Sequence, residues 1–209
     1  MARKTKEEAQ ATRSAILDAA EALFQARGVS STSLQDIAAA AGVTRGAIYW
    51  HFQDKGDVFN AMMDRACTPL AQAIDDILTG HQGSPVATVR AKMALLLQSV
   101  ERDANTRRVF EIATRKVEYV DDLAAVREQQ TQLRDQYIAK MAELLREAQA
   151  AGEVDPACDA LELAFALHAL VDGLMQNWLI TPDALSLQRV GNRAIAHYLA
   201  GLRPGAAPP

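Results

Sequence analysis

Four consecutive ring side chains lie at the end of the segment GVTRGAIYWHF, residues 42–52. Because an α-helix turns about 100° per residue, the rings of residues 49–52 would sweep most of its circumference and cannot all face one core. Ile48 and Phe52 are four residues apart and predict a buried side, which leaves Arg45 and other rings on the outside. Guanidinium, phenol and imidazole groups on an exposed helix suit contacts with phosphates and base edges. The segment therefore predicts a helix that contacts DNA.

The other residues that often carry chemistry form no catalytic pattern. The four histidines, at positions 51, 81, 168 and 197, lack the spacing of a metal site. The sequence contains neither a glycine-rich phosphate loop nor a Gly-x-Ser-x-Gly segment. The adjacent carboxylates of Asp75–Asp76 and Asp121–Asp122 diverge on a helix and fit solvated faces. We predict that the protein is not an enzyme and uses no cofactor or metal.

The composition is that of a globular protein of one or two domains, with 209 residues, 49% apolar residues and a net charge of −4. No apolar run reaches the roughly 18 residues of a membrane span, and the charged start lacks the apolar segment of a signal peptide. We expect a cytoplasmic protein with no membrane contact. Cys67 and Cys158 are expected to be reduced, buried thiols. Residues 1–55 hold seven basic and six acidic residues, against 22 and 26 in the whole chain, so the amino-terminal part is the more positive.

Three helices are expected to position the ring segment. The first spans about residues 6–27, and its buried stripe is Ile16, Ala20, Leu23 and Phe24. The second follows SSTS and stops at Gly42, where a tight turn needs a positive φ. Its capping box is one of two pairs, Thr32 with Gln35 or Ser33 with Asp36. Thr44 caps the third. This is the pattern of a helix-turn-helix whose third helix enters the major groove.

The remaining chain also reads as helices, so the predicted fold class is all-α with about nine helices. Asp54 caps a fourth helix that reaches about Leu78, and a loop covers 79–85. Further helices are expected at 86–102, 105–118, 121–151, 156–180 and 183–200. The predicted domains are a helix-turn-helix domain over 1–55, a ligand-binding and dimerisation bundle over 56–203, and a flexible tail over 204–209.

The predicted helix at 156–180 is apolar on two sides. One side carries Leu163, Leu167, Leu170, Leu174 and Trp178, and the other carries Phe165, His168, Asp172, Met175 and Gln176. A helix that is apolar on both sides must be buried on both sides, and a second copy of the chain is the simplest extra partner. A larger monomeric bundle is the alternative. The side with Asp172 is either the polar part of a ligand cavity or a buried polar pair with His168 that fixes packing.

The segment TSLQDIAAAAGVTRGAIYWHFQDKGDVFNAMMD resembles the DNA-binding region of the tetracycline-repressor (TetR) family. The opening ARKTKEEAQATRSAILDAAEALF and the later segments TRRVFEI, VDDLAAVREQQ and ALVDGLMQNWL are similar to the subgroup that represses multidrug efflux pumps of the RND type. The resemblance covers nearly the whole chain and is most specific over residues 12–57.

The resemblance implies a bacterial homodimer that binds palindromic double-stranded operator DNA, and so associates with the nucleoid when bound. It implies release by a small hydrophobic or aromatic inducer and control of a multidrug efflux operon. A regulator of metabolism that senses a fatty-acyl compound or another metabolite is the alternative, and a helical protein-interaction module is a third possibility. In the expected mechanism a ligand tilts the fourth helix, and the two recognition helices lose their separation of about 34–36 Å.

Three sets of site residues are predicted. The DNA-contacting set is Arg3, Lys4, Thr32, Ser33, Thr44, Arg45, Gly46, Ala47, Tyr49, Trp50, His51 and Lys55. The ligand-contacting set is Met62, Met63, Ala66, Cys67, Leu70, Met93, Leu96, Val100, Phe110, Thr114, Val117, Tyr137, Phe165, His168, Asp172, Met175 and Gln176. The dimer-interface set is Leu163, Leu167, Leu170, Leu174, Trp178, Leu187, Val190, Gly191, Ala194, Ile195 and Tyr198.

Overall fold

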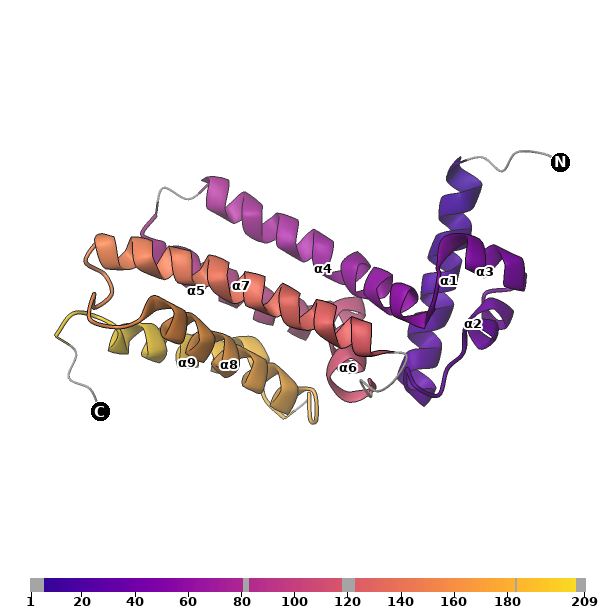
Figure 1. Ribbon diagram of the computed structural model, residues 1–209. Coiled ribbons are helices and arrows are strands. Elements are labelled where there is room, and N and C mark those ends of the chain that lie inside the picture. Colours follow the sequence, from indigo (N-terminus) through magenta and orange to yellow (C-terminus); the bar gives the residue numbers. More distant parts are fainter. Residues whose placement is uncertain (1–5, 81–82, 118–122, 183, 206–209) are drawn as a thin grey trace. The chain divides into compact units, whose positions relative to one another are not determined.

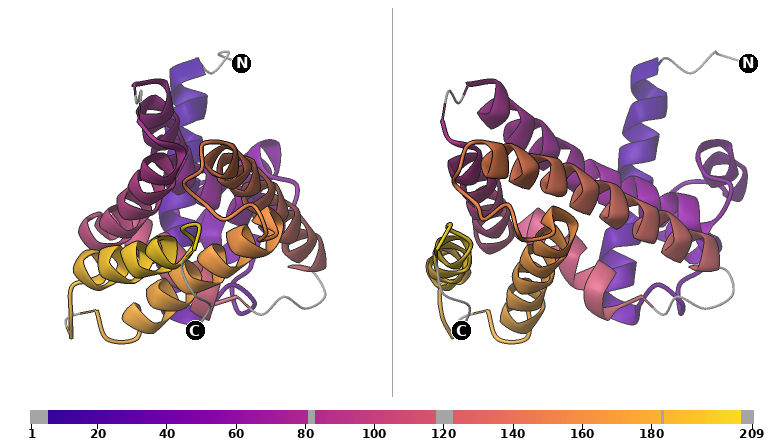
Figure 2. Two further views of the ribbon diagram at one scale, coloured as in Figure 1. Left: turned by 90° about the vertical axis from the view of Figure 1, so that its left-hand side faces the viewer. Right: turned by 60° about the vertical axis from the view of Figure 1, so that its left-hand side comes forward.

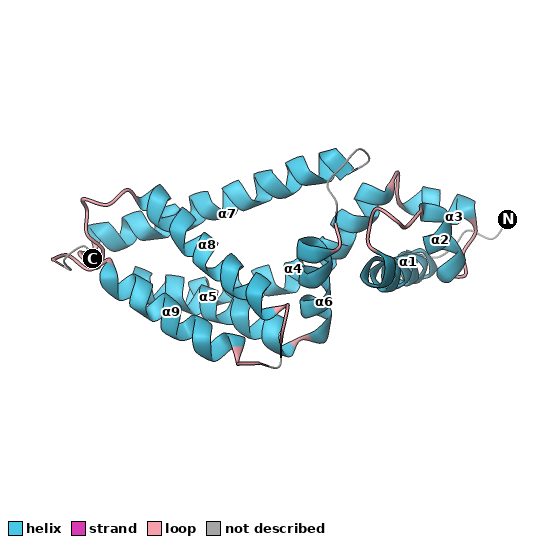
Figure 3. Ribbon diagram, turned by 90° about the horizontal axis from the view of Figure 1, so that it is seen from below, coloured by secondary structure: helices cyan, strands magenta, loops and turns pink. Residues whose placement is uncertain are grey.

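The computed structural model describes residues 6–80, 83–117, 123–182 and 184–205. These residues form nine α-helices joined by turns and loops, as Figures 1 and 3 show, so the predicted all-α class is confirmed. The helices are α1 (Lys6–Arg27), α2 (Leu34–Ala40), α3 (Arg45–His51), α4 (Lys55–Gly80), α5 (Pro85–Arg102), α6 (Ala104–Arg115), α7 (Ala124–Ala150), α8 (Ala160–Trp178) and α9 (Leu187–Gly201). Five residues named above lie outside the described ranges: Arg3, Lys4, His81, Asp121 and Asp122.

The chain divides into two compact units, each made of two separate stretches. Unit 1 comprises residues 1–68 and 108–130, and unit 2 comprises 69–107 and 131–209. The predicted single cut after residue 55 differs from this division. The first turns of α4 carry Val58 and Phe59 into the core of unit 1, and residues from α6 and α7 join them there.

Unit 1 is built around α1, against which α2 and α3 cross (Figure 1). The stripe of Ile16, Ala20 and Phe24 is fully buried, as predicted, while Leu23 is partly buried and Leu17 is buried as well. Burial of each of the larger apolar side chains contributes about 1.5–3 kcal/mol to the stability of the fold. The same core takes in Val109 and Ile112 from α6.

One carboxylate lies inside unit 1 among these apolar groups. Glu21 on α1 is 3% exposed, and its two oxygens accept hydrogen bonds from Arg65 on α4 at 3.0 Å and from Arg108 on α6 at 2.8 Å. Arg65 also pairs with the exposed Asp18 at 2.6 Å. A buried charge is tolerated only when it is paired, and here the pairing joins three helices of unit 1.

Unit 2 is a helical bundle in which α9 packs on both α5 and α8, as Figures 1 and 2 show. Gly191 on α9 packs closely against α5, because a Cβ atom built there would lie 2.3 Å from Cδ1 of Leu97. Trp178 at the end of α8 donates its indole N–H to the Leu185 carbonyl, and the Arg107 guanidinium lies 4.9 Å from its ring centroid.

Candidate nucleic-acid interface and sensor residues

The turn between α2 and α3 has the geometry that the sequence predicted. Gly42 has a φ of 66°, and Val43 N–H donates to the Ala38 carbonyl at 3.0 Å. Thr44 caps α3, because its hydroxyl oxygen accepts a hydrogen bond from Ala47 N–H at 3.1 Å. An N-cap of this kind contributes about 1 kcal/mol to its helix. The chain therefore enters α3 in one defined direction.

Helix α3 buries one side and exposes the other. Ile48 is fully buried and Phe52 is 4% exposed, as the spacing predicts. Trp50 is 72% exposed and Tyr49 is 50% exposed, so Trp50 does not pack against α1. An exposed tryptophan on a short helix has apolar surface that water solvates poorly, which favours a partner on this face.

The exposed side chains of α3 are held by contacts with one another. The Arg45 guanidinium lies 5.6 Å from the centroid of the Tyr49 ring, and the rings of Trp50 and His51 meet edge to face at 4.5 Å. A guanidinium stacked on a ring loses less side-chain entropy when it binds a phosphate or a base. Arg45 is therefore preorganised for such a contact.

Helix α2 begins at the second of the two predicted capping boxes. The Ser33 hydroxyl oxygen accepts from Asp36 N–H at 3.1 Å, and Ser33 N–H donates to the Asp36 carboxylate at 3.0 Å. The hydrogen bond from the Ser33 side chain, followed by that from its backbone, lowers the pKa of Asp36. Thr32 is instead buried, and its hydroxyl donates to the Gly28 carbonyl at 2.8 Å.

The two helices and the loop before α2 border a groove of about 590 Å³ on unit 1. Lys55 lines it and donates from Nζ to the Ser30 carbonyl at 3.3 Å, which fixes the start of α4 to this loop. The groove brings together the predicted residues Thr32, Ser33, Arg45, Tyr49 and Lys55.

Sequence reasoning missed several polar residues of this groove, namely Ser30, Ser31, Gln35 and Gln53. The signal for Ser30 and Ser31 was the polar run SSTS directly before the capped helix, which was treated only as a capping segment. The carboxylates of Asp36 and Asp54 also line the groove, and each accepts a backbone hydrogen bond at a helix start.

The predicted ligand residues are divided between the two units. In unit 2 the structure brings Met93, Tyr137 and His168 together. The Tyr137 hydroxyl donates to the Met93 sulfur at 3.6 Å, and the rings of Tyr137 and His168 are 5.9 Å apart. Burial raises the pKa of Tyr137, so the phenol stays protonated. Burial lowers the pKa of His168, Asp172 opposes this effect and Arg134 adds to it.

Asp172 is half-buried, and its carboxylate accepts a hydrogen bond from Gln176 at 2.6 Å. Asp172 was predicted to pair with His168, and in the structure the two side chains interact through their charges. The hydrogen bond of the Asp172 carboxylate comes from Gln176 instead. Of the other predicted ligand residues in unit 2, Val100 and Met175 are buried and Leu70 and Leu96 are half-buried.

In unit 1 the predicted ligand residues range from buried to exposed. Met62 and Ala66 are buried in its core, and Met63 and Val117 pack partly against that core. Cys67 is half-buried, and burial raises the pKa of its thiol. Phe110 is half-buried, whereas Thr114 is exposed and its hydroxyl donates to the Phe110 carbonyl at 2.8 Å.

The structure divides α8 differently from the sequence prediction. Its buried residues are Ala160, Ala164, Leu167, Val171, Met175 and Trp178. Leu167 and Trp178, predicted for a dimer interface, therefore pack inside the chain, as do Leu187, Gly191 and Ile195 of α9. Phe165, predicted for the ligand cavity, is 55% exposed. Both sides of α8 are apolar, so periodicity alone does not tell the inner from the outer side.

The remaining predicted interface residues are partly accessible. Leu163, Leu170, Leu174, Val190, Ala194 and Tyr198 are all half-buried within one chain. The Tyr198 hydroxyl donates to the Leu163 carbonyl at 2.8 Å and joins α9 to α8. An exposed apolar set lies elsewhere on and just after α8, at Leu161, Phe165 and Ile180.

Comparison with known proteins agrees with this architecture. The chain matches the family described as "Bacterial regulatory proteins, tetR family" over residues 16–62, and "MAATS-type transcriptional repressor, C-terminal region" over residues 84–204. It is 39% identical over 195 residues to the HTH-type transcriptional regulator TtgR of Pseudomonas putida, and the match covers 90% of this chain and 89% of that protein.

Two solved structures are similar over almost their whole length. NalD, the secondary repressor of the MexAB-OprM multidrug efflux pump in Pseudomonas aeruginosa, has a TM-score of 0.85 and 32% identity over 96% of this chain and 100% of its own. The complex of SmeT with triclosan has a TM-score of 0.80 and 35% identity over 96% of each chain. SmeT represses the Stenotrophomonas maltophilia multidrug efflux pump SmeDEF.

An exposed, capped helix-turn-helix followed by a helical carboxy-terminal region defines a DNA-binding transcriptional regulator, not an enzyme. This chain belongs to the TetR family of bacterial regulatory proteins. In the part of the chain that the structure describes, no helix is long and apolar enough to cross a membrane.

Proposed function

We propose that this protein is a dimeric repressor that binds a palindromic operator, is released by small hydrophobic compounds, and controls a multidrug efflux operon. The observation that carries this function is the similarity over nearly the full chain to NalD and SmeT, each the repressor of a multidrug efflux pump. The exposed face of α3 supports the DNA part of the proposal, because Arg45, Tyr49 and Trp50 are solvent-accessible on a helix whose other side is buried.

The ligand would interact with Tyr137 and His168 of unit 2. Tyr137 is half-buried, and its hydroxyl donates to a thioether, which is a weak acceptor. A carbonyl, phenol or ether oxygen of a ligand would be the stronger partner for this proton. The adjacent Met93 has a flexible, polarizable side chain that adapts to ligands of different shape. Aromatic compounds with at least one oxygen acceptor fit this environment.

The dimer would form through the exposed apolar side of α8. Leu161, Phe165 and Ile180 are each at least half exposed, and such a set beside the half-buried residues of α9 supports a second copy as the partner. Two copies would present two α3 helices to successive major grooves, about 34–36 Å apart. Ligand binding acts on DNA affinity through its different affinity for the two states, a coupling of about 1–3 kcal/mol.

Fluorescence anisotropy with the DNA directly upstream of the gene tests this function. We expect salt-sensitive binding that several unrelated hydrophobic antibiotics and plant phenolics relieve. Arg45→Ala should weaken binding at least about tenfold, whereas Arg27→Ala, an exposed arginine outside the groove, should not. Binding that none of the compounds relieves would overturn the drug-sensing part, and a panel of fatty-acyl compounds would then identify a metabolic signal. Absence of binding to any upstream DNA would overturn the repressor itself.

A further inference from the structure

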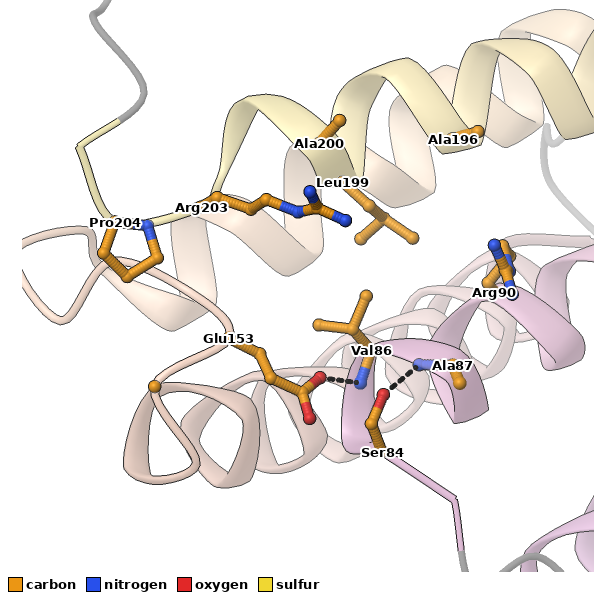
Figure 4. A pocket seen from close by; sticks show the side chains of 11 residues that line it. Ser84, Val86, Ala87, Arg90, Glu153, Ala196, Leu199, Ala200, Arg203 and Pro204 are labelled. Atoms are coloured by element: carbon orange, nitrogen blue, oxygen red, sulfur yellow. Dashed lines mark hydrogen bonds between the residues drawn. The ribbon is translucent and has the colours of Figure 1, made fainter.

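Unit 2 contains a cavity of about 620 Å³ between the start of α5 and the end of α9, and residues 152–153 after α7 also line it. Figure 4 shows ten of the lining residues with labels. We propose that this cavity is a binding site for a small organic anion, a carboxylate or sulfonate carried on an apolar body. Its volume is in the range of small-molecule sites, about 300–1,000 Å³. The site is independent of the DNA-binding face and of the ligand residues discussed above.

The charge of the lining favours an anion. Arg90 on α5 and Arg203 after α9 both line the cavity. Neither guanidinium has an ion-pair partner among the described residues. Figure 4 shows Arg203 reaching from the end of α9 along Leu199. Two arginines that line one opening suit the planar oxygen pairs of carboxylates and sulfonates.

The one acidic residue of the lining is already engaged. The Glu153 carboxylate accepts a hydrogen bond from Val86 N–H at 3.1 Å, and the Ser84 hydroxyl oxygen accepts from Ala87 N–H at 3.2 Å (Figure 4). These bonds satisfy the free N–H groups at the start of α5, so this helix end offers no anion site of its own. Recognition of the anion depends on the arginines.

The rest of the lining is apolar and extends along the two helices. Val86, Leu199 and Ala200 give the cavity an apolar side. A second cavity of about 360 Å³ shares Ala87, Arg90 and Ala196 with the first and continues past Ala91 and Ala94 to Asn192. The Asn192 Oδ1 atom is buried and has no hydrogen-bond partner within the described part of the chain. An apolar body with an N–H or O–H group therefore matches this end.

The cavity lies nearer the start of α5 and nearer the end of α9 than the predicted ligand and dimer residues on these helices do. At 100° per residue, Ala91 and Ala94 lie about 100° or more from Met93 on α5. On α9, Ala196 and Ala200 are separated by about 120° or more from Ala194 and Tyr198 of the predicted interface. A ligand here and a ligand beside Tyr137 would contact different side chains.

The test uses the full-length protein and two probes that share one aromatic body. 8-Anilinonaphthalene-1-sulfonate carries the sulfonate and an N–H group, and N-phenyl-1-naphthylamine lacks only the sulfonate. Arginine Nε–Hε resonances of ¹⁵N-labelled protein are followed by NMR, and those of Arg90 and Arg203 are assigned from Arg90→Gln and Arg203→Gln. We expect both resonances to shift saturably with the sulfonate and not with the uncharged probe.

The binding constant from this titration is then compared among variants. The double variant Arg90→Gln/Arg203→Gln, followed through backbone amides of α5 and α9, should bind the sulfonate at least about tenfold more weakly. The control Lys140→Gln/Arg146→Gln removes the same charge from exposed positions on α7 and should bind as the wild type does. Ala196→Trp, at an exposed position, should fill the opening and abolish the shifts while circular dichroism stays unchanged. Unshifted arginine resonances, or equal weakening in the double variant and its control, would overturn the proposal.

Discussion

At the scale of single residues, Glu21 is a charged side chain that is buried in unit 1. Its buried carboxylate bridges Arg65 and Arg108, so it joins α1 to α4 and α6. We expect Glu21→Ala to destabilise the protein by about 2 kcal/mol, because two arginines lose a buried partner but remain partly exposed and can be hydrated. The shift in thermal unfolding midpoint measures this effect.

Asp18 provides the matched control for Glu21. It pairs with the same Arg65 at 2.6 Å, but it is exposed. Surface ion pairs contribute about 0–1 kcal/mol, so Asp18→Ala should change stability much less than Glu21→Ala. Equal losses of stability in the two variants would show that the burial of Glu21 does not increase its contribution to stability.

His168 gives the sensor residues a pH dependence. Its half-buried ring has a lowered pKa, first because of burial, with Asp172 opposing and Arg134 reinforcing the effect. As the pH falls below the ordinary value of 6.5, the unfolded chain takes up a proton that the folded protein resists, so stability decreases with acidification. We expect the thermal unfolding midpoint of His168→Asn to fall less between about pH 7.5 and about pH 5.5 than that of the wild type does. Identical losses in both proteins would contradict this account.

At the scale of elements, two glycines in unit 2 should respond oppositely to substitution. A Cβ at Gly191 would lie 2.3 Å from the fully buried Leu97, whereas a Cβ at Gly173 in α8 would meet nothing within 4 Å. Gly191→Ala should cost about 1–3 kcal/mol through overpacking of α5 against α9. Gly173→Ala should stabilise α8 by about 0.5–1 kcal/mol, because alanine loses less backbone entropy in a helix. Chemical unfolding of both variants checks the two signs.

Helix α4 contains a proline at an informative place. Pro69 lies inside the helix, and the boundary between the two units falls between Thr68 and Pro69. Proline cannot donate to the carbonyl four residues earlier, that of Arg65, which weakens the helix locally. We expect Pro69→Ala to slow amide hydrogen exchange over about residues 66–72, with Gln72→Ala as a control that leaves the hydrogen-bond pattern intact. Unchanged exchange in Pro69→Ala would mean that the proline does not limit the stability of α4.

Sequence signals from a few neighbouring residues, such as helix caps and turn glycines, predicted the helices of the helix-turn-helix well. The capping pair Ser33–Asp36, the cap Thr44 and the positive φ of Gly42 each depend on a few neighbouring residues, so the helix-turn-helix could be located before the structure was known. The orientation of α8 could not, because leucines and aromatic rings occupy most of its circumference and the inner side depends on packing with other helices. Glu21 was missed for the same reason, since its two partners are 44 and 87 residues away in the sequence.

At the scale of the whole molecule, the division into units required long-range contacts that no local pattern encodes. Residues 108–130 belong with the helix-turn-helix in unit 1, and Val109 and Ile112 share its core. The sequence resemblance assigns this stretch to the carboxy-terminal region, which the match over residues 84–204 also does. The core that supports the DNA-binding helices therefore includes side chains from α6.

The assembly of two such chains depends, in our proposal, on the exposed side of α8. Phe165→Glu places a charge one helical turn from Leu161 on the exposed apolar side of α8. Burying an unpaired carboxylate between two subunits is strongly unfavourable, so we expect this variant to be monomeric in sedimentation velocity. A monomer holds one half-site only, so operator affinity should fall at least about tenfold in anisotropy.

Leu133→Glu is the matched control for this substitution, because Leu133 is an exposed leucine of α7, 46% accessible, outside the apolar set. It should remain dimeric and bind the operator as the wild type does, since it adds the same charge to a solvated surface. A Phe165→Glu protein that stays dimeric would place the interface on another surface. A monomer that keeps full operator affinity would remove the need for two bound half-sites, and the symmetric palindrome would lose its physical basis in this protein.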